Sequence, residues 1–338
     1  MTTQKHTIDD FAMMEAMRYY NSEEESAKRT DILNNKNNEY IASVKNDGCW
    51  SLCIHYSKGN NLIRSRSISK VTGVYGDYTE KVPHLVAEMD NWPDNTAVLA
   101  ELCWDKPGTN ANTVGTILRC LPAKAVERQK DEKLVGKIFD ILMYDGVDLT
   151  STPYEERIII WAARVSCMDY SHYFKRTPII KDGVDFREAA DEVIAAGGEG
   201  IVIQRKDNPY MPGTRTAWKT LKLKQSLPEM ELKVIATIEP KKDYEGEDPE
   251  HWQFRDENGN PVTKPYFYGW MNGIRVEHGD FTTDVTSGLT DMDREWLATM
   301  DAQEMIRNGE LYAVVKAMSF NDKGALRHPY VVRLRNDL

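Results

Sequence analysis

The chain has 338 residues, of which 41% are hydrophobic and 28% are charged, and its formal net charge is −10. This length suits two ordinary domains, and no apolar run approaches the ~18 residues that a membrane span requires. Five scattered cysteines indicate neither a disulfide framework nor a zinc site, and the N-terminus lacks a signal-peptide pattern, so we expect a cytoplasmic protein with no membrane partner.

The N-terminal residues predict a helix that ends at a polar break. Apolar side chains recur at helical spacing from residue 8 to about residue 34, and the asparagine-rich stretch NNKNN follows. We therefore predict one helix over 8–34.

The stretch EYIASVKNDGCW places Lys45 at the end of an apolar strand, directly before the turn Asn46-Asp47-Gly48. Alternation on both sides of this turn predicts a β-hairpin. Four side chains after the turn share one face, namely Trp50, Leu52, Ile54 and Tyr56. Lys45 is then either a solvated lysine at a strand end or a nucleophile held on a rigid strand.

Residues 39 to about 145 are rich in strand patterns, and two of these strands carry charged residues. Arg64 and Arg66 share one face of LIRSRSISK, where they could meet an anion or form a solvated basic edge. Glu101 interrupts the apolar strand TAVLAELCW. A carboxylate there is costly unless it is paired or opens into a cavity, so we favour a functional site over a structural ion pair.

Two helices and two strands follow. TPYEERIIIWAARV begins a helix at Thr152 and Pro153, and a second helix over about 186–196 ends at Gly197-Gly198. The strand EGIVIQRK opens on Glu199, where Gly198 and Gly200 would let a metal-bound triphosphate approach, or would mark a turn or β-bulge. In TAWKTLKLKQ one face carries Trp218, Thr220, Lys222 and Lys224.

From residue 231 onward the pattern changes to short alternating strands, with one helix at about 291–307. This pattern predicts a small β-barrel such as an OB-fold. We expect an α+β protein with a first domain over 1–228 and the barrel over 229–338.

A lysine nucleophile needs particular neighbours. A free amine with a pKa near ~10.4 is protonated at neutral pH, and nearby cations lower that pKa while stabilising phosphate charge in the transition state. Carboxylates such as Glu101 and Glu199 are suitable ligands for Mg²⁺ on a nucleotide. Together these residue types describe nucleotidyl transfer onto an amine.

The order of VKNDG, SRSISK, LAELCW, GKIFDIL, GGEGIVI and LKLKQ resembles the covalent nucleotidyltransferases, and most of all the compact ATP-dependent DNA ligases of bacteriophages. The C-terminal GALRHPYVVRLRND is similar to the last ligase motif. The resemblance implies an adenylation domain of antiparallel sheets with flanking helices, followed by an OB-fold.

The resemblance also implies roles for single residues. Lys45 would take AMP from ATP, Lys222 and Lys224 would contact the α-phosphate, and Glu199 together with Glu101 would bind Mg²⁺. Ser43 would lie at the adenine amino group, and Phe139 and Val202 on the two faces of adenine. Asp47 and Glu101 would contact the ribose or an associated metal, and Arg66 a phosphate or ribose oxygen. Trp50 stands where relatives commonly carry an arginine, and Arg64 could supply the missing contact.

The implied partners are ATP and nicked duplex DNA, bound by a monomer. The net charge argues weakly against a nucleic-acid partner, but basic residues gather in three stretches that could face the DNA. The residues expected to contact nucleic acid are Arg64, Lys70, Arg205, Arg215, Arg327, Arg333 and Arg335.

The expected activity is the sealing of 5′-phosphate/3′-hydroxyl nicks through a lysyl-AMP intermediate. The nearest alternatives are an RNA ligase or an mRNA-capping guanylyltransferase of the same superfamily. A further alternative is a catalytically silent nucleic-acid-binding relative.

Overall fold

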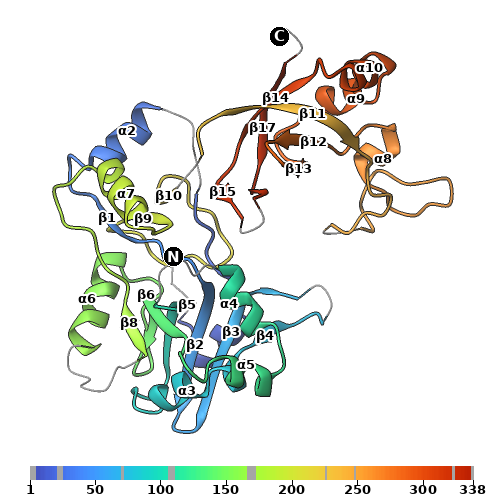
Figure 1. Cartoon of the computed structure of the whole chain (residues 1–338). Coiled ribbons are helices and arrows are strands. Elements are labelled where there is room, and N and C mark those ends of the chain that lie inside the picture. The colour runs from blue at the N-terminus through green and yellow to red at the C-terminus, as the bar shows by residue number, and fades with distance from the viewer. Residues whose placement is uncertain are drawn as a thin grey trace. The chain divides into compact units, whose positions relative to one another are not determined.

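A computed structural model describes residues 5–20, 26–69, 72–105, 111–165, 173–224, 227–246, 249–321 and 324–335. The chain divides into two compact units, Met1–Lys224 and Gln225–Leu338, whose elements are labelled in Figure 1. Within the described ranges, every helix is too short or too polar to cross a lipid bilayer.

The first unit contains a seven-stranded sheet in its described part. Its strands in spatial order are β4 (Tyr75–Asp77), β3 (Asn60–Ile68), β2 (Cys49–Ser57), β5 (Thr96–Cys103), β6 (Val135–Tyr144) and β7 (Val147–Asp148), with β8 (Phe174–Arg176) parallel to β6. The stretch expected to be mainly strands also holds η1 (Thr79–Lys81), α3 (Pro83–Met89), α4 (Ala111–Leu118) and α5 (Pro122–Arg128). These helices have at most eight residues, too few for a clear helical period to emerge from sequence.

Both faces of this sheet are buried. Alternation along β2 sends Leu52 and Ile54 to one face, where they join a core with Phe11, and sends Cys53 to the other. Trp50 and Tyr56 pack against the same core as Leu52 and Ile54, which confirms the predicted shared face. Because β5 is covered on both sides, Glu101 is the exception in a strand whose other residues are all buried.

A second, three-stranded antiparallel sheet holds β1 (Tyr40–Val44), β9 (Gly200–Arg205) and β10 (Thr220–Lys224), with β9 in the centre. The predicted hairpin around Asn46-Asp47-Gly48 is wrong, because β1 pairs with β9 whereas β2 pairs with β3 and β5. A tight turn does not specify which strands it joins. Here the turn connects the small sheet to the large sheet, and Lys45 lies between the end of β1 and this turn.

The predicted single helix over 8–34 is also wrong. The chain forms α1 (Ile8–Met13) and α2 (Ala27–Asn34), and extended backbone lies between them at Arg18 and Tyr20. The apolar residues of this stretch serve two different cores, since Phe11, Met14 and Met17 pack on the large sheet and Ile32 and Leu33 on the small one. One straight helix could not reach both.

The two later helices of this unit are confirmed. α6 (Tyr154–Val165) starts directly after Pro153, and α7 (Phe186–Ala195) is capped by the Asp185 side chain, which accepts from the Arg187 amide. α7 packs on the small sheet, as Figure 1 shows, and ends before Gly197, whose φ of 85° favours glycine.

The second unit is built on an antiparallel five-stranded sheet. Its strands in spatial order are β13 (Phe281–Val285), β12 (Gly273–His278), β11 (Met230–Ile238), β14 (Tyr312–Lys316) and β17 (Tyr330–Arg335). The other elements of this unit are α8 (Lys264–Tyr268), α9 (Asp291–Leu297), α10 (Met300–Asn308), β15 (Ser319–Phe320) and β16 (Leu326–Arg327). The sheet curls around one apolar core, which is consistent with the expected OB-fold. The predicted helix at 291–307 is two helices, because Thr299 caps the start of α10.

Candidate active site

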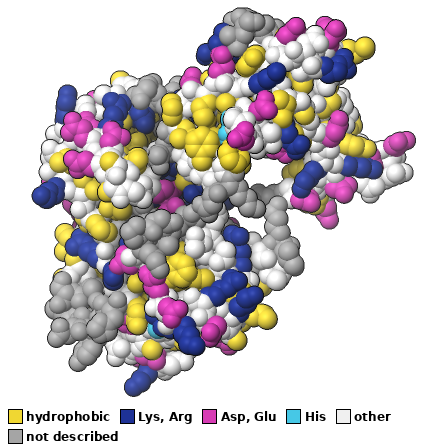
Figure 2. Space-filling view, viewed as in Figure 1, with side chains coloured by type: hydrophobic (Ala, Val, Ile, Leu, Met, Phe, Trp, Pro, Cys, Tyr) yellow, Lys and Arg dark blue, Asp and Glu magenta, His cyan; other side chains and the backbone are white. Residues whose placement is uncertain are grey.

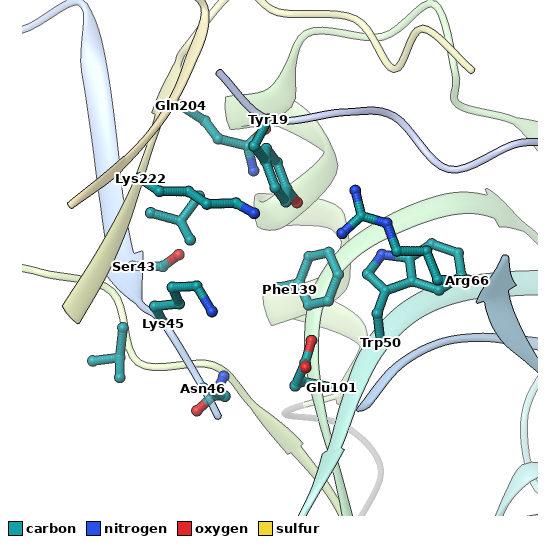
Figure 3. Close-up of a pocket in the computed structure, with 12 residues that line it drawn as sticks. Tyr19, Ser43, Lys45, Asn46, Trp50, Arg66, Glu101, Phe139, Gln204 and Lys222 are labelled. Atoms are coloured by element: carbon teal, nitrogen blue, oxygen red, sulfur yellow. The ribbon is translucent and has the colours of Figure 1, made fainter. Parts of the chain in front are cut away.

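A pocket that is partly open to solvent lies where the two sheets of the first unit meet, and its empty volume is about 580 Å³. Figure 3 shows Lys45, Lys222, Glu101 and Arg66 directed toward one common space. Its lining residues are Tyr19, Ser43, Val44, Lys45, Asn46, Trp50, Arg66, Glu101, Phe139, Val202, Gln204 and Lys222. The small sheet supplies one wall and strands β2, β3, β5 and β6 supply the other.

Lys45 is fixed by its backbone at the end of β1. Its amide donates to the Gly200 carbonyl at 2.8 Å, and the preceding Val44 amide donates to the Pro178 carbonyl at 2.9 Å. The side chain is 19% exposed, and its ammonium donates to the Glu199 carboxylate. These contacts exclude a solvated strand-end lysine.

The glycines around Glu199 are required by backbone packing. A Cβ on Gly200 would lie 2.1 Å from the Leu223 carbonyl oxygen, and the φ of this residue is +135°. A Cβ on Gly198 would lie 2.7 Å from a methyl group of Val193. Both glycines are therefore required by the close approach of neighbouring atoms, and the expected approach of a triphosphate stays a prediction.

Glu101 lines the pocket, as its position in an apolar strand indicated. Burial raises the pKa of its carboxyl to about 7, while the positive charge of Lys45 acts in the opposite direction. Glu199 acts on Glu101 with the same sign as burial, so the two carboxylates are close enough to repel each other. A cation placed between them would relieve this repulsion.

Lys222 reaches the pocket from β10, where it lies opposite Val202 in the strand register. Burial lowers the pKa of its ammonium to about 8, and Lys45 and Arg66 add to this effect. Lys224 lies opposite Gly200 of β9, which separates it from the end of β1, and it is not among the residues that line the pocket. Trp218, predicted to belong to the same strand face, instead has a φ of 65° and precedes β10.

Ser43, Val202 and Phe139 all line the pocket. Ser43 lies opposite Val202 across the β1–β9 ladder and is only 5% exposed. Phe139 extends into the same pocket from β6, across from Ser43 in Figure 3. An apolar ring and a branched aliphatic side chain on either side of a gap are suited to hold a flat aromatic base.

Five lining residues were not among the predicted site residues, namely Tyr19, Val44, Asn46, Trp50 and Gln204. Strand alternation could have found Gln204, which lies two residues after Val202 on the same face of β9. Nothing in the local sequence marks Tyr19, because its segment reaches the pocket only through the tertiary fold.

Arg64 cannot serve as a nucleic-acid contact. It is 2% exposed, its guanidinium stacks 3.9 Å from the Tyr75 ring centre, and it donates to the carbonyls of Phe11 and Met14. The guanidinium of Arg64 holds the end of α1. Arg64 therefore also cannot supply the contact of the arginine that relatives commonly carry at the position of Trp50.

Other expected site residues are placed elsewhere. The Asp47 carboxylate accepts from the Ala111 amide at 2.9 Å and so lies at the start of α4. Arg205 follows Gln204 on β9, so its side chain points to the sheet face opposite the pocket, and it pairs with Asp207 at 3.0 Å. In the second unit Arg335 pairs with Glu231, whereas Arg333 is exposed.

Two further expected contacts lie on the surface, since Arg215 is exposed and Arg327, in β16, is partly exposed. Lys70 lies outside the described residues.

The fold and this pocket define the class of the protein: a nucleotidyltransferase domain followed by an OB-fold domain. The family model "ATP dependent DNA ligase domain" matches residues 24–224. The chain therefore belongs to the ATP-dependent DNA ligase family.

Curated relatives and solved structures agree with this assignment. A DNA ligase of Archaeoglobus fulgidus is 29% identical over 299 residues, which cover 84% of this chain and 49% of that protein. A DNA ligase of Methanocorpusculum labreanum is 26% identical over 303 residues, with the same two coverages. The chain thus spans about half the length of these curated relatives.

Among solved structures, a Lig E DNA ligase matches with a TM-score of 0.60 and 18% identity, over 88% of this chain and 93% of that chain. The ligase domain of Mycobacterium tuberculosis LigD matches with a TM-score of 0.51 and 17% identity, over 97% of each chain. At these identities the likeness shows the fold.

Proposed function

We propose that this protein seals 5′-phosphate/3′-hydroxyl nicks in duplex DNA with ATP, through a lysyl-AMP intermediate on Lys45. The observation that carries the proposal is the placement of Lys45. Its ammonium lies at a rigid strand end, beside Glu199, in a pocket that is also lined by Lys222, Glu101 and Phe139. Family membership supports the same activity.

The pocket offers a distinct place for each part of ATP. Adenine would lie between Phe139 and Val202, with the Ser43 hydroxyl at its edge. Arg66, directed into the same space from β3, would meet a ribose or phosphate oxygen, and Glu101 would contact the ribose. Because Trp50 lines the wall next to Arg66 in Figure 3, Arg66 supplies the cation that the neighbouring strand lacks.

The residues at the phosphate end suit Mg²⁺. Glu199 and Glu101 are two mutually repelling carboxylates, and this ion binds through one or two carboxylates together with substrate phosphates. When bound, it would neutralise charge on the triphosphate. Lys222 and Lys224, both on β10, would hold the α-phosphate.

In the first reaction the neutral Lys45 amine attacks the α-phosphorus. A phosphorus–nitrogen bond forms, the bond to the bridging oxygen breaks, pyrophosphate leaves, and the amine proton passes to solvent. AMP then moves from Lys45 to the 5′-phosphate of the nick, and the 3′-hydroxyl attacks that phosphate and releases AMP. The proposed active form is a monomer.

Incubation with α-labelled ATP and Mg²⁺, followed by denaturing electrophoresis, tests the proposal. The wild-type protein is expected to retain label, and Lys45→Ala is expected to lose it completely, because no other side chain is held at the same point. Lys58→Ala, which removes an exposed lysine from the β2–β3 turn, is the matched control and should label normally. Label on Lys45→Ala would place the nucleophile elsewhere.

Further experiments distinguish a DNA ligase from the other candidate activities of the superfamily. Labelling by GTP in place of ATP would indicate a capping enzyme. Sealing of nicked RNA but not of nicked DNA would indicate an RNA ligase. Absence of any label from the wild-type protein would indicate a silent relative.

A further inference from the structure

The pocket contains a tyrosine from a segment that belongs to neither sheet. Tyr19 lies in the extended stretch between α1 and α2, yet its side chain lines the pocket. The centre of its ring lies 5.0 Å from the ammonium nitrogen of Lys222. Figure 3 shows the ring beside the end of the Lys222 side chain.

Backbone hydrogen bonds on both sides fix Tyr19 in this position. The Arg18 amide donates to the Thr214 carbonyl at 2.8 Å, and the Tyr20 amide donates to the Thr220 carbonyl at 2.9 Å. One residue earlier, the Met17 amide donates to the Tyr210 hydroxyl at 3.0 Å. The segment is thereby tied to the same stretch of chain that leads into β10 and carries Lys222.

The two neighbouring tyrosines point in different directions. The Tyr20 ring packs 5.1 Å from the Trp218 ring and joins the core of the small sheet, whereas Tyr19 faces the pocket. Successive side chains of an extended backbone alternate in this way. Tyr20 therefore provides a control for loss of a ring from the same segment.

An aromatic ring suits the particular demand at Lys222. Lys45 and Arg66 repel its ammonium, and its flexible four-carbon stem could move away from them. A carboxylate would hold the ammonium but would also neutralise it and repel a phosphate. The face of a neutral ring attracts the cation and leaves its charge available. Burial raises the pKa of the Tyr19 hydroxyl, so the ring stays neutral.

We propose that Tyr19 is a positioning residue that holds the Lys222 ammonium over the site of nucleotidyl transfer. It takes no part in making or breaking a bond. The expected effect of Tyr19 on the reaction rate rests on the proposed function. The expected effect of Tyr19 on the position of the Lys222 side chain rests on the ring geometry alone.

The first test measures lysyl-AMP formation in single-turnover reactions over a range of ATP concentrations. Tyr19→Leu removes the ring and is expected to lower the maximal rate about tenfold, with little change in the ATP concentration at half-maximal rate. Tyr19→Phe keeps the ring and is expected to react at close to the wild-type rate. Tyr20→Leu is expected to be less stable but to keep the wild-type rate. An unchanged rate in Tyr19→Leu, or an equal loss in Tyr19→Phe, would overturn the inference.

The second test does not depend on the activity. Brief acetylation with peptide mapping by mass spectrometry reports the reactivity of Lys222 in each variant. Lys222 is expected to react faster in Tyr19→Leu than in the wild-type protein, Tyr19→Phe or Tyr20→Leu, because its ammonium is no longer held. Equal reactivity in all four proteins would refute the placement. A wild-type protein that forms no lysyl-AMP but shows this reactivity difference would refute the proposed function and leave the inference standing.

Discussion

At the scale of single residues, the pocket places titratable groups where burial and like charges oppose their charged forms. Lys222 shows this best, because burial, Lys45 and Arg66 all lower the pKa of its ammonium from 10.5 to about 8. An anion bound beside such a buried ammonium would strongly stabilise its charged form. A phosphate is therefore expected to bind beside Lys222, where it would offset the unfavourable buried positive charge.

The lowered pKa of Lys222 has a consequence for stability. Below about pH 8 the lysine is protonated in both the folded and the unfolded state. Between about pH 8 and 10.5 the unfolded state binds more protons than the folded state, so the free energy of unfolding rises with pH through this window. At lower pH this contribution is lost, and the buried charge destabilises the fold.

Lys222→Met is therefore expected to flatten this part of the stability profile. Urea unfolding of both proteins at about pH 7.5 and about pH 9.5 checks the expectation. The wild-type protein should gain more stability than the variant between the two pH values. The same gain in both proteins would show that Lys222 has an ordinary pKa.

At the scale of the elements, two arginines two residues apart on β3 do different work. Arg64 is buried and holds the backbone carbonyls of Phe11 and Met14 at the end of α1, whereas Arg66 lines the pocket. Sequence placed them together on one face as candidate anion contacts. Arg64 holds the segment after α1, and Arg66 is expected to contribute to ligand binding.

Arg64→Met is expected to destabilise the protein by about 2 kcal/mol, because it removes the donor to a buried carbonyl. Urea unfolding measures the loss, and amide hydrogen exchange in residues 8–17 should become faster. Arg66→Met is the matched variant, with little expected change in stability but weaker ATP binding. Equal stability of the two variants would contradict the structural role assigned to Arg64.

At the scale of the whole molecule, the net charge of −10 must be reconciled with the proposed polyanionic substrate, nicked DNA. On the face displayed in Figure 2, basic and acidic side chains are interspersed over both units. Contacts to DNA are therefore expected from individual exposed arginines rather than from the overall charge. Those already held by a carboxylate, such as Arg205 and Arg335, contribute less.

Arg333 and Arg335 allow this to be tested within one strand. Arg333→Ala is expected to weaken binding of nicked duplex DNA. The slope of the logarithm of the binding constant against the logarithm of the salt concentration should become shallower by about 1, since one phosphate contact is lost. Arg335→Ala should change the slope less, because its charge is paired with Glu231. Fluorescence anisotropy over a series of salt concentrations measures both. Identical slopes for both variants and the wild-type protein would remove Arg333 from the interface.

Much of the architecture followed from local pattern. The sequence predicted helices α6 and α7, the apolar face of β2, the position of Glu101 in the pocket, and the α+β class with an OB-fold at its end. These predictions succeeded because periodicity, capping residues and an isolated carboxylate are local signals. The failures share a cause. The N-terminal helix, the hairpin at Asn46-Asp47-Gly48 and the role of Arg64 each required knowing which distant segment would pack there.

What the sequence determined by itself is the inventory and order of the chemical groups: a lysine at a strand end, two carboxylates, two lysines on a later strand, and the family to which this order belongs. What only the tertiary structure decided is which of them meet. The turn after Lys45 joins two sheets instead of two neighbouring strands, and an extended segment brings Tyr19 against Lys222. Strand pairing and side-chain burial depend on contacts far apart in the chain, which no local pattern encodes.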